Sequence, residues 1–367
     1  MRRIVVARHD RLGDLVLSLP AVHALRLAYP SARLALLVDP TLAPLARSVE
    51  GVDRVIEAAP RGLRRRLREF EADLLVCISR GVAIPWAGLR ARIPHRVGSG
   101  YRYYSAIFGR RVREHRSGGA RHEAEYALSF AHRAGAPAGP ARFPLRLSKE
   151  VEREAKDWLA KHELGNRFVL LHPGGSGSCP CWPIEHYVRL AALLEGEGLR
   201  VALSIGPSDR AVATALEAAP ETTRRLPWFT GGLEQLAVLC KRAGLVATNS
   251  TGPLHLAAAL GTPTLGFFAP WPSCGVGRWG PYAENGWVLV ADLEEARRWS
   301  RRQRRRRGAA LLETIAPDLA ASCVKNLLEG RPPQPLQGSK RAWGTSRIES
   351  TRPTMKSASS SRLRGLK

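Results

Sequence analysis

Two aspartates stand in one short loop near the start of the chain, where a carboxylate could do chemistry. The segment RHDRLGDLVLSLP, residues 8–20, directly follows the apolar run IVVA, so Asp10 and Asp14 come between a predicted strand and a predicted helix. A carboxylate at such a junction can accept a proton from a substrate, which typically contributes about 10²–10⁴-fold in rate. It can also stabilise the first turn of the helix by roughly 1 kcal/mol. The residue types alone leave both roles open.

Two further strand ends carry residues that suit a phosphate or a sugar. The segment LLHPGGSGS, residues 170–178, contains Gly174 and Ser176, whose small size and hydroxyl let hydrogen-bond donors approach an anion. It lacks the spacing of a P-loop. The segment LSIGPSD, residues 203–209, turns at a Gly-Pro pair and offers Asp209 to the hydroxyls of a ribose. A plain turn is the simpler interpretation of this second segment taken alone.

A helix start within ATNSTGPLHLAAALGTP, residues 247–263, gives the strongest of these signals. Residue types that cap helices precede Pro253, and Gly261 marks the end of the predicted helix. Free backbone N–H groups and the helix dipole suit such a start to a diphosphate. A well-capped structural helix with a histidine at its edge explains the same residues equally well. The residues concerned are Asn249, Ser250, Thr251, Gly252 and His255.

The elements that must position these residues predict an α/β protein with parallel sheets. Apolar runs alternate with amphipathic stretches in the first half (RIVVAR, ARLALLVD, ADLLVCIS) and again in the second (RFVLLHPGG, RVALSIGPSD, AGLVATNSTG, PTLGFFAP). We expect two α/β domains, at residues 1–150 and 151–330, followed by a disordered basic tail at 331–367. Ligands of such open sheets bind where strands end, so the residues above fall at the expected places.

Several kinds of site and protein are disfavoured. No strand is followed by G-x-G-x-x-G, which counts against a nicotinamide or flavin dehydrogenase. The six cysteines are scattered, as expected for reduced thiols, and the one close pair, Cys179 and Cys181, lacks the further ligands of a zinc site, so we expect no metal. Neither a signal peptide nor a run of roughly 20 apolar residues is present, so we expect a cytoplasmic protein.

The net charge of +25 comes mostly from arginine and predicts a polyanionic partner. Nucleic acid, an acidic lipid surface and a phosphorylated substrate would all satisfy this charge. The densest run is RRWSRRQRRRRG, from Arg297 through Arg307 to Gly308. We expect it to be a solvated surface helix or loop, with contact to acidic phospholipid or to an anionic substrate as the alternative.

Four segments, taken in order, resemble glycosyltransferase family 9, the ADP-heptose:lipopolysaccharide heptosyltransferases and their relatives. They are RHDRLGDLVLSLPAVHALR, the pair His122-Glu123 before a predicted helix, HPGGSGSCPCWPIEHY, and TNSTGPLHLAAALGTPTLGFFAP. The resemblance covers residues 1–330. It implies a GT-B architecture, in which two Rossmann-like domains face each other across a cleft. The C-terminal domain would then hold the nucleotide-sugar, and the N-terminal domain would receive the acceptor.

The resemblance also implies roles for particular residues. The general base of the family matches Asp14, and the segment that holds the donor diphosphate and sugar matches Thr251, Gly252 and His255. Transfer in this family inverts the anomeric centre without a metal, and we expect no other cofactor. The remaining donor-binding candidates are Gly174, Ser176, Asp209, Asn249 and Ser250.

The arginines of the first domain then suit an anionic, lipid-linked glycan as acceptor. Neighbouring arginines can make paired hydrogen bonds to phosphates and carboxylates, so Arg8, Arg11 and Arg64 are candidates. For the group Arg61–Arg68 a solvated surface is the simpler interpretation. We expect Asp10 only to brace its loop through Arg8 or Arg11.

The chain departs from the heptosyltransferases at two positions. Ser250 stands where they often have Asp before Thr-Gly, and Pro180 stands where they often have Lys before Trp-Pro. ADP-heptose is the first expectation for the donor, but these changes leave the sugar open. A nucleotide-sugar epimerase of the same fold and a non-catalytic polyanion-binding module are the alternatives. We expect a monomer that contacts the inner membrane surface transiently and does not bind nucleic acid.

Overall fold

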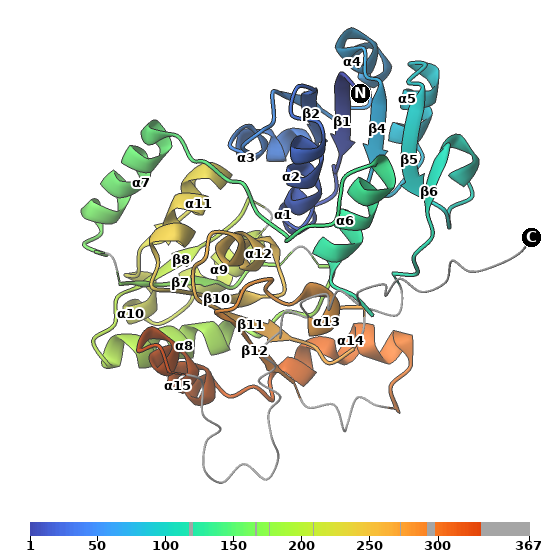
Figure 1. Ribbon diagram of the computed structural model, residues 1–367. Coiled ribbons are helices and arrows are strands. Elements are labelled where there is room, and N and C mark those ends of the chain that lie inside the picture. Colours follow the sequence, from blue (N-terminus) through green and yellow to red (C-terminus); the bar gives the residue numbers. More distant parts are fainter. Residues whose placement is uncertain are drawn as a thin grey trace, which may run out of the picture.

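The computed structural model describes residues 1–116, 120–165, 167–175, 177–207, 209–271, 273–291 and 298–331. Within them the chain builds two parallel sheets of six strands each, flanked by helices, so the prediction of an α/β fold is confirmed (Figure 1). Ser176, Arg297 and the predicted tail beyond Arg331 lie outside the described residues. No helix in the described part of the chain has the length and apolar character needed to cross a membrane.

The first sheet has the strand order β3-β2-β1-β4-β5-β6. Consecutive residues of its central strands are buried, as expected for strands covered by helices on both faces. The helix predicted after the first strand is divided in two at Leu17 and Ser18. The elements are β1 (Arg3–Ala7), α1 (Leu12–Val16), α2 (Leu19–Ala28), β2 (Arg33–Val38), η1 (Pro40–Leu42), α3 (Ala43–Arg47), β3 (Arg54–Glu57), α4 (Leu63–Phe70), β4 (Leu74–Cys77), α5 (Ala83–Arg90), β5 (His95–Ser99), η2 (Ser105–Ile107), β6 (Arg110–Val112) and α6 (Glu123–Ala134).

The second sheet has the order β12-β11-β10-β7-β8-β9. Helix α7 begins the second half, and the Ser148 hydroxyl caps its first turn by accepting a hydrogen bond from the Val151 N–H at 3.2 Å. The elements are α7 (Lys149–Lys161), β7 (Val169–His172), α8 (Ile184–Gly196), β8 (Val201–Ser204), α9 (Arg210–Glu217), α10 (Glu221–Arg224), β9 (Trp228–Phe229), α11 (Leu233–Arg242), β10 (Leu245–Asn249), α12 (Gly252–Ala259), β11 (Thr264–Phe268), α13 (Val276–Trp279), β12 (Gly286–Val290), α14 (Arg301–Leu312) and α15 (Pro317–Leu328).

Both sheets reverse their strand order at the centre. Strand β1 pairs with β2 on one side and β4 on the other, and β7 pairs in the same way with β8 and β10. Connections on the two sides of such a reversal leave by opposite faces of the sheet, so a crevice opens at the carboxyl ends of the central strands. The residues that follow β1, β7 and β10 are therefore placed where ligands of this fold bind.

Alternate residues of each strand pack against two layers of helices. In β1, Ile4 and Val6 belong to the apolar cluster that includes α2 and α6, whereas Val5 and Ala7 face α4 and α5. In the second sheet, α8 and α15 cover one face and α11 and α12 cover the other.

One apolar cluster joins the two halves of the molecule. Val16 of α1 and Leu45 of α3 pack into the same cluster as Leu239 of α11 and Leu256 of α12. Helices α1 and α12 therefore lie side by side where the first sheet meets the second (Figure 1). This packing brings the ends of β1 and β10 together.

Candidate functional site

Two glycines allow α1 and α12 to approach closely. A Cβ atom at Gly13 would lie 2.7 Å from Cδ2 of His255, and a Cβ atom at Gly252 would lie 2.7 Å from Cβ of Leu12. Both distances are shorter than van der Waals contact, so a larger residue fits at neither position without displacing its neighbour. The Gly-Asp and Thr-Gly segments, which are far apart in the sequence, thus interlock.

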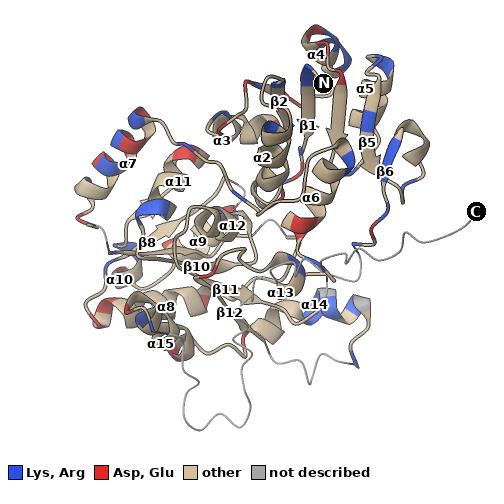
Figure 2. Cartoon of the chain, viewed as in Figure 1, with Lys and Arg blue, Asp and Glu red and all other residues tan. Residues whose placement is uncertain are grey.

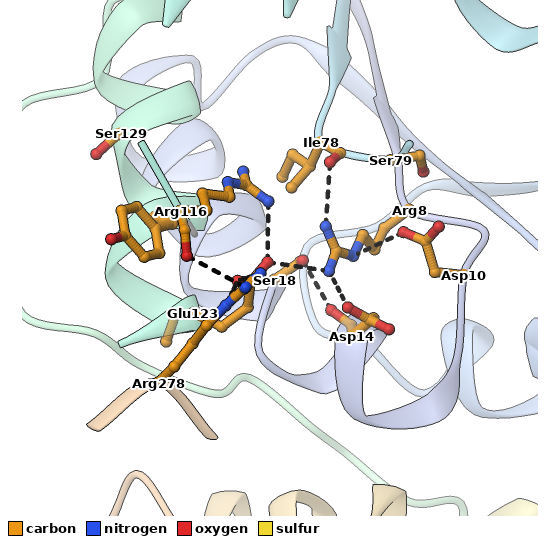
Figure 3. Close-up of polar contacts among 12 residues, drawn as sticks. Arg8, Asp10, Asp14, Ser18, Ile78, Ser79, Arg116, Glu123, Ser129 and Arg278 are labelled. Carbon is orange, nitrogen blue, oxygen red and sulfur yellow. Dashed lines mark hydrogen bonds and ion pairs between the residues drawn. The ribbon is translucent and has the colours of Figure 1, made fainter. Parts of the chain in front are cut away.

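Asp14 lies in the first turn of α1 and points toward Arg8 (Figure 3). One of its oxygens pairs with Nη2 of Arg8, and the Asp14 side chain remains 19% exposed. The N-cap of α1 is Arg11, so Asp14 does not occupy the capping position. Oδ2 of Asp10 lies 3.3 Å from Nε of Arg8, which is the brace expected for Asp10. The pairing of Asp14 with the same arginine was not predicted.

Arg8 is buried and held on several sides. It is only 2% exposed. Its Nη1 donates to the carbonyl oxygen of Ile78 at 3.1 Å, and its Nη2 donates to Oε1 of Glu123 at 3.2 Å. The prediction that Arg8 contacts the acceptor finds no support in this geometry, because the guanidinium already contacts a carbonyl and three carboxylates. These contacts instead fix the position of Asp14.

Glu123, at the start of α6, gathers arginines from distant parts of the chain (Figure 3). Its Oε1 accepts a hydrogen bond from Nη1 of Arg116 at 2.9 Å as well as from Arg8. Its Oε2 accepts from Nε and Nη2 of Arg278 at 3.0 and 2.8 Å. Arg278 belongs to α13, so this carboxylate, whose side chain is 2% exposed, links the first half of the molecule to the second.

The charges of this cluster compensate for its burial. Burial alone would raise the pKa of Glu123, but the charges of Arg116, Arg8 and Arg278 hold that pKa below its ordinary value. Burial would lower the pKa of Arg8, yet Asp14 and the neighbouring carboxylates raise it. Burial lowers the pKa of Arg116 to about 10 in spite of Glu123. Glu123, Arg8 and Arg116 therefore carry their charges near neutral pH.

Two buried histidines beside the cluster are neutral instead. Nδ1 of His122 accepts a hydrogen bond from the Ala124 N–H at 3.2 Å, and its Nε2 donates to the carbonyl oxygen of Gly280 at 2.9 Å. His255 is 4% exposed, and its Nδ1 has no hydrogen-bond partner among the described residues. Burial, together with the nearby His122, lowers the pKa of His255 to about 3. Burial likewise lowers the pKa of His122.

The N-terminus of α12 is built differently from the sequence prediction. Thr251 is its N-cap, but the hydroxyl lies 3.1 Å from Oγ1 of Thr248 and 3.3 Å from the carbonyl oxygen of Asn249 and does not cap the helix. Thr251 therefore lies at the start of the helix, but its side chain does not provide the cap that its residue type suggests. Because the Thr251 side chain does not satisfy the first-turn N–H groups, these groups remain suited to an anion.

Asn249 is used inside the protein. Its Oδ1 accepts from the Trp182 N–H at 2.8 Å, while its Nδ2 donates to the carbonyl oxygens of Pro173 and Gly174 at 3.0 and 3.3 Å. Asn249 is 1% exposed. It joins the loop after β7 to the end of β10, which points to a structural role in place of the predicted contact with the donor.

Asp209 joins two loops in a similar way. Its Oδ1 accepts from the Gly175 N–H at 3.2 Å, and its Oδ2 accepts from the Gly206 N–H at 2.9 Å. A Cβ atom at Gly174 would lie 2.1 Å from Oδ2, so the loop can pass the carboxylate only as glycine. A cavity of about 290 Å³ opens beside this junction. Its lining residues are Pro173, Gly175, Cys181, Trp182, Pro183, Ile184, Asp209, Ala211 and Val212.

Other predicted residues lie apart from this site or give less information. Arg64 is exposed on α4, at the end of the first sheet away from α1 (Figure 1). Arg11 is exposed in the loop before α1, and Ser250 is partly exposed beside Thr251. The described part of the densest arginine run begins α14 after a Ser300–Gln303 capping box, with Arg302, Arg306 and Arg307 exposed, as expected for a surface helix.

The sequence did not indicate the residues of the Glu123 cluster. His122-Glu123 was part of the family resemblance, but no role was assigned to either residue. Arg116 and Arg278 carried no signal, because arginine is abundant throughout the chain. Their importance follows only from their convergence on one buried carboxylate.

The assembled geometry suits transfer of a group away from an anionic leaving group. A partly exposed carboxylate on α1 can act as a base, and the N-terminus of α12 beside it can meet negative charge. The loops after β7 and β8 add backbone donors and a cavity next to that helix.

Several known proteins are similar to this chain in sequence or in fold. Lipopolysaccharide heptosyltransferase 2 of Salmonella typhimurium is 26% identical over 289 residues, covering 73% of this chain and 83% of the relative. Among solved structures, a glycosyl transferase family 9 protein from Veillonella parvula has a TM-score of 0.77 at 20% identity, covering 90% of this chain and 98% of its own. The ADP-heptose lps heptosyltransferase II of E. coli has a TM-score of 0.74 at 21% identity, covering 90% and 99%. Both structures share the fold.

A family profile that matches most of the chain shows which family this protein belongs to. The sequence profile of glycosyltransferase family 9 (heptosyltransferase) matches residues 61–307, which include Glu123, Arg116 and Arg278, the loops after β7 and β8, and α12. The chain therefore belongs to glycosyltransferase family 9 and is a glycosyltransferase.

Proposed function

We propose that this enzyme transfers heptose from ADP-heptose to an anionic, lipid-linked glycan of the cell envelope, such as the core of lipopolysaccharide. The observation that carries the proposal is the close packing of α1 on α12, which sets the helix of Asp14 against the N-terminus suited to the donor diphosphate. The names of similar proteins, lipopolysaccharide heptosyltransferase 2 among them, support this sugar and this acceptor.

In the proposed mechanism Asp14 removes the proton from an acceptor hydroxyl as that oxygen attacks the anomeric carbon. The attack comes from the side opposite the nucleoside diphosphate, so a new C–O bond forms while the bond to the diphosphate breaks, and the configuration inverts. The first-turn N–H groups of α12, near Thr251 and Gly252, stabilise the charge that gathers on the leaving group. No step requires a metal.

Arg8 and Glu123 act in this mechanism through Asp14. Arg8 pairs with Asp14, and Glu123 holds Arg8 in a buried position. Both are therefore positioning residues, and the hydroxyl of the acceptor meets only the carboxylate of Asp14. Arg11, in the loop beside Asp14, is the acceptor-binding candidate that this geometry favours over Arg64.

In this proposal a monomer carries out the reaction in the cytoplasm, at the inner face of the membrane. A lipid-linked acceptor and a water-soluble donor can both reach the enzyme there. The packing of both halves of one chain around α1 and α12 supplies base and donor site together, which supports the monomer.

A panel of nucleotide-sugars tests the donor and separates the alternatives. The enzyme is incubated with ADP-heptose and with other ADP-, UDP- and GDP-sugars, with and without a lipopolysaccharide-core acceptor, and release of nucleoside diphosphate is followed. We expect release that needs both ADP-heptose and acceptor. Preference for another sugar would overturn the heptose assignment. We would then attribute the change of donor to Ser250 and Pro180, where the chain departs from the heptosyltransferases. Formation of an epimer or of free sugar without acceptor would favour the epimerase instead.

A further inference from the structure

One surface of the first half is basic and carries no acidic residue. It is formed by α5, the loop after β5 and the edge strand β6, and we call residues 80–113 the aromatic-arginine surface. These residues include eight arginines and no Asp or Glu, and all of the arginines except Arg96 are exposed. Helix α5 packs against η2, and β5 pairs with β6, so the segments are neighbours in space. Figure 2 shows basic positions on α5, β5 and β6 with no acidic position between them.

The same surface holds most of the large hydrophobic side chains that the described residues expose. Tyr103 is 88% exposed, Tyr101 48%, Trp86 46% and Leu89 37%. Trp86 and Leu89 are three residues apart on α5 and so share one side of the helix. The Arg90 guanidinium carbon lies 5.1 Å from the centroid of the Trp86 ring. Tryptophan and tyrosine with arginine are the side chains that settle at the headgroup level of a bilayer.

A short series of contacts connects this surface to the base. The Tyr101 ring stacks on His115 with the ring centroids 4.0 Å apart. Arg116 follows His115 and pairs with Glu123, which belongs to the cluster that holds Asp14. Side chains of the first half thus connect this surface to the carboxylate of Asp14.

We propose that the aromatic-arginine surface docks the enzyme on an anionic lipid bilayer, with the exposed rings in the interfacial layer and the arginines on lipid phosphates. Each arginine near an anionic leaflet strengthens binding about fivefold, so several together suffice for a reversible contact. The proposal rests on the lipid-linked acceptor of the proposed function, although docking itself needs neither donor nor acceptor. The aliphatic Leu89 beside Trp86 favours a bilayer over single-stranded nucleic acid. The bases of nucleic acid stack on aromatic rings and cannot stack on an aliphatic side chain.

Sedimentation of the full chain with vesicles tests this surface directly. Vesicles of phosphatidylcholine with phosphatidylglycerol should bind the protein, and vesicles of phosphatidylcholine alone should bind it far less. The double variant Arg102→Glu/Arg110→Glu should weaken binding at least about tenfold. The matched control Arg224→Glu/Arg225→Glu makes the same change of charge at exposed positions of α10 and its C-cap in the second half and should change binding less than about twofold.

A second pair of variants separates the rings from the charge. Tyr103→Ser alters a side chain that is almost fully exposed, so the fold should persist, and binding should fall about threefold. Leu27→Ser, at a side chain 65% exposed on α2, is its control and should bind as the parent does. Equal losses for both charge-reversal pairs, or no loss for Tyr103→Ser, would overturn the proposal. A competition with single-stranded RNA could also overturn it. If the RNA displaces the protein from vesicles, and if Tyr103→Ser weakens RNA binding, the surface binds nucleic acid instead.

Transfer to a water-soluble acceptor fragment distinguishes failure of the surface from failure of the proposed function. If such transfer proceeds while no vesicle binding is seen, the docking surface is refuted and the proposed reaction stands. If vesicle binding follows the expected pattern of variants while no acceptor is glycosylated, the reaction is refuted and the surface stands.

Discussion

The first and second sheets share one strand order, but they equip the ends of their central strands in different ways. After β1 the first sheet presents charged side chains, with Asp14 paired to Arg8 and Arg8 held by Glu123. After β7 and β10 the second sheet presents backbone donors, small residues and the neutral His255. The same topology therefore delivers a base from one side and a site for a leaving anion from the other.

The difference shows that a charged side chain and a backbone N–H group are held in position in different ways. A carboxylate that must stay charged and fixed needs surrounding partners, and the arginines around Glu123 supply them. Backbone N–H groups at a helix start are fixed by the helix itself and need only space for the ligand, which the glycines provide. The variants below test each half of this comparison, beginning with the largest effect.

Asp14→Asn removes the proposed base while it keeps the size of the side chain. Transfer should fall about 10²–10⁴-fold in kcat, with the KM for the donor nearly unchanged, because the donor side is untouched. Nucleoside diphosphate release measures both values. Asp10→Asn changes a carboxylate of similar exposure that also contacts Arg8, and we expect it to lose much less activity. Near-normal transfer in Asp14→Asn would show that the Asp14 carboxylate is not the catalytic base.

Glu123→Gln leaves Arg8, Arg116 and Arg278 without their shared carboxylate. Removing one partner of a buried ion pair typically costs about 3–5 kcal/mol, so the free energy of unfolding should drop by about 3 kcal/mol and the denaturant midpoint with it. Activity should fall as well, since Arg8 loses its support. Glu125→Gln changes a partly exposed carboxylate on the same helix and serves as the control. Comparable losses in the two variants would argue against a special role for the cluster.

Gly252→Ala tests the contact between the halves. The added methyl group would meet Leu12, and overpacking of this kind typically costs about 1–3 kcal/mol. We expect roughly tenfold slower transfer, because α1 must shift away from α12. The second change Leu12→Ala should restore part of the activity by making room. Gly196→Ala, at the end of α8 where a Cβ atom meets nothing within 4 Å, should be neutral. Failure of the rescue would show that α1 and α12 do not need to interlock.

His255 should make the stability of the protein depend on pH. Its pKa in the folded protein is about 3, below the ordinary value of about 6.5, so between these values the unfolded chain binds a proton that the folded chain does not. Stability is therefore lost as the pH falls through this window, by roughly 2 kcal/mol between pH 6.5 and 5 for this group. Urea midpoints at the two pH values should fall less in His255→Gln than in the parent, and an exposed control, His95→Gln, should behave as the parent. Equal pH dependence in all three proteins would contradict the buried neutral histidine.

Arg64→Ala should have the smallest effect. Arg64 is exposed on α4, away from α1, so transfer should stay within about twofold of the parent. Arg11→Ala, in the loop beside Asp14, is the informative partner and should raise the KM for the acceptor. A larger loss in Arg64→Ala than in Arg11→Ala would reverse this assignment of the acceptor side.

Local patterns predicted the strands and helices that carry the motifs. Apolar runs predicted β1, β2 and β4 in the first half and β7, β8, β10 and β11 in the second, because apolar residues make up most of each strand. The four edge strands, β3, β6, β9 and β12, were not predicted, and neither was β5. β6, for example, is three residues long with two exposed arginines, and β9 has only two residues. Short, partly polar segments lack the periodicity that marks a strand.

The sequence by itself determined the fold class, the family resemblance and the two motifs that meet at the site. Gly13 with Asp14, and Thr251 with Gly252, could be identified because glycine beside a functional residue at a strand end is a local pattern. Only the tertiary structure decided which partners each residue has. Arg8 points inward and pairs with Asp14, and the Asn249 side chain forms hydrogen bonds to a neighbouring loop. Glu123 binds arginines from both halves. Such pairings depend on distances between residues far apart in the chain, and residue types and local spacing carry no record of those distances.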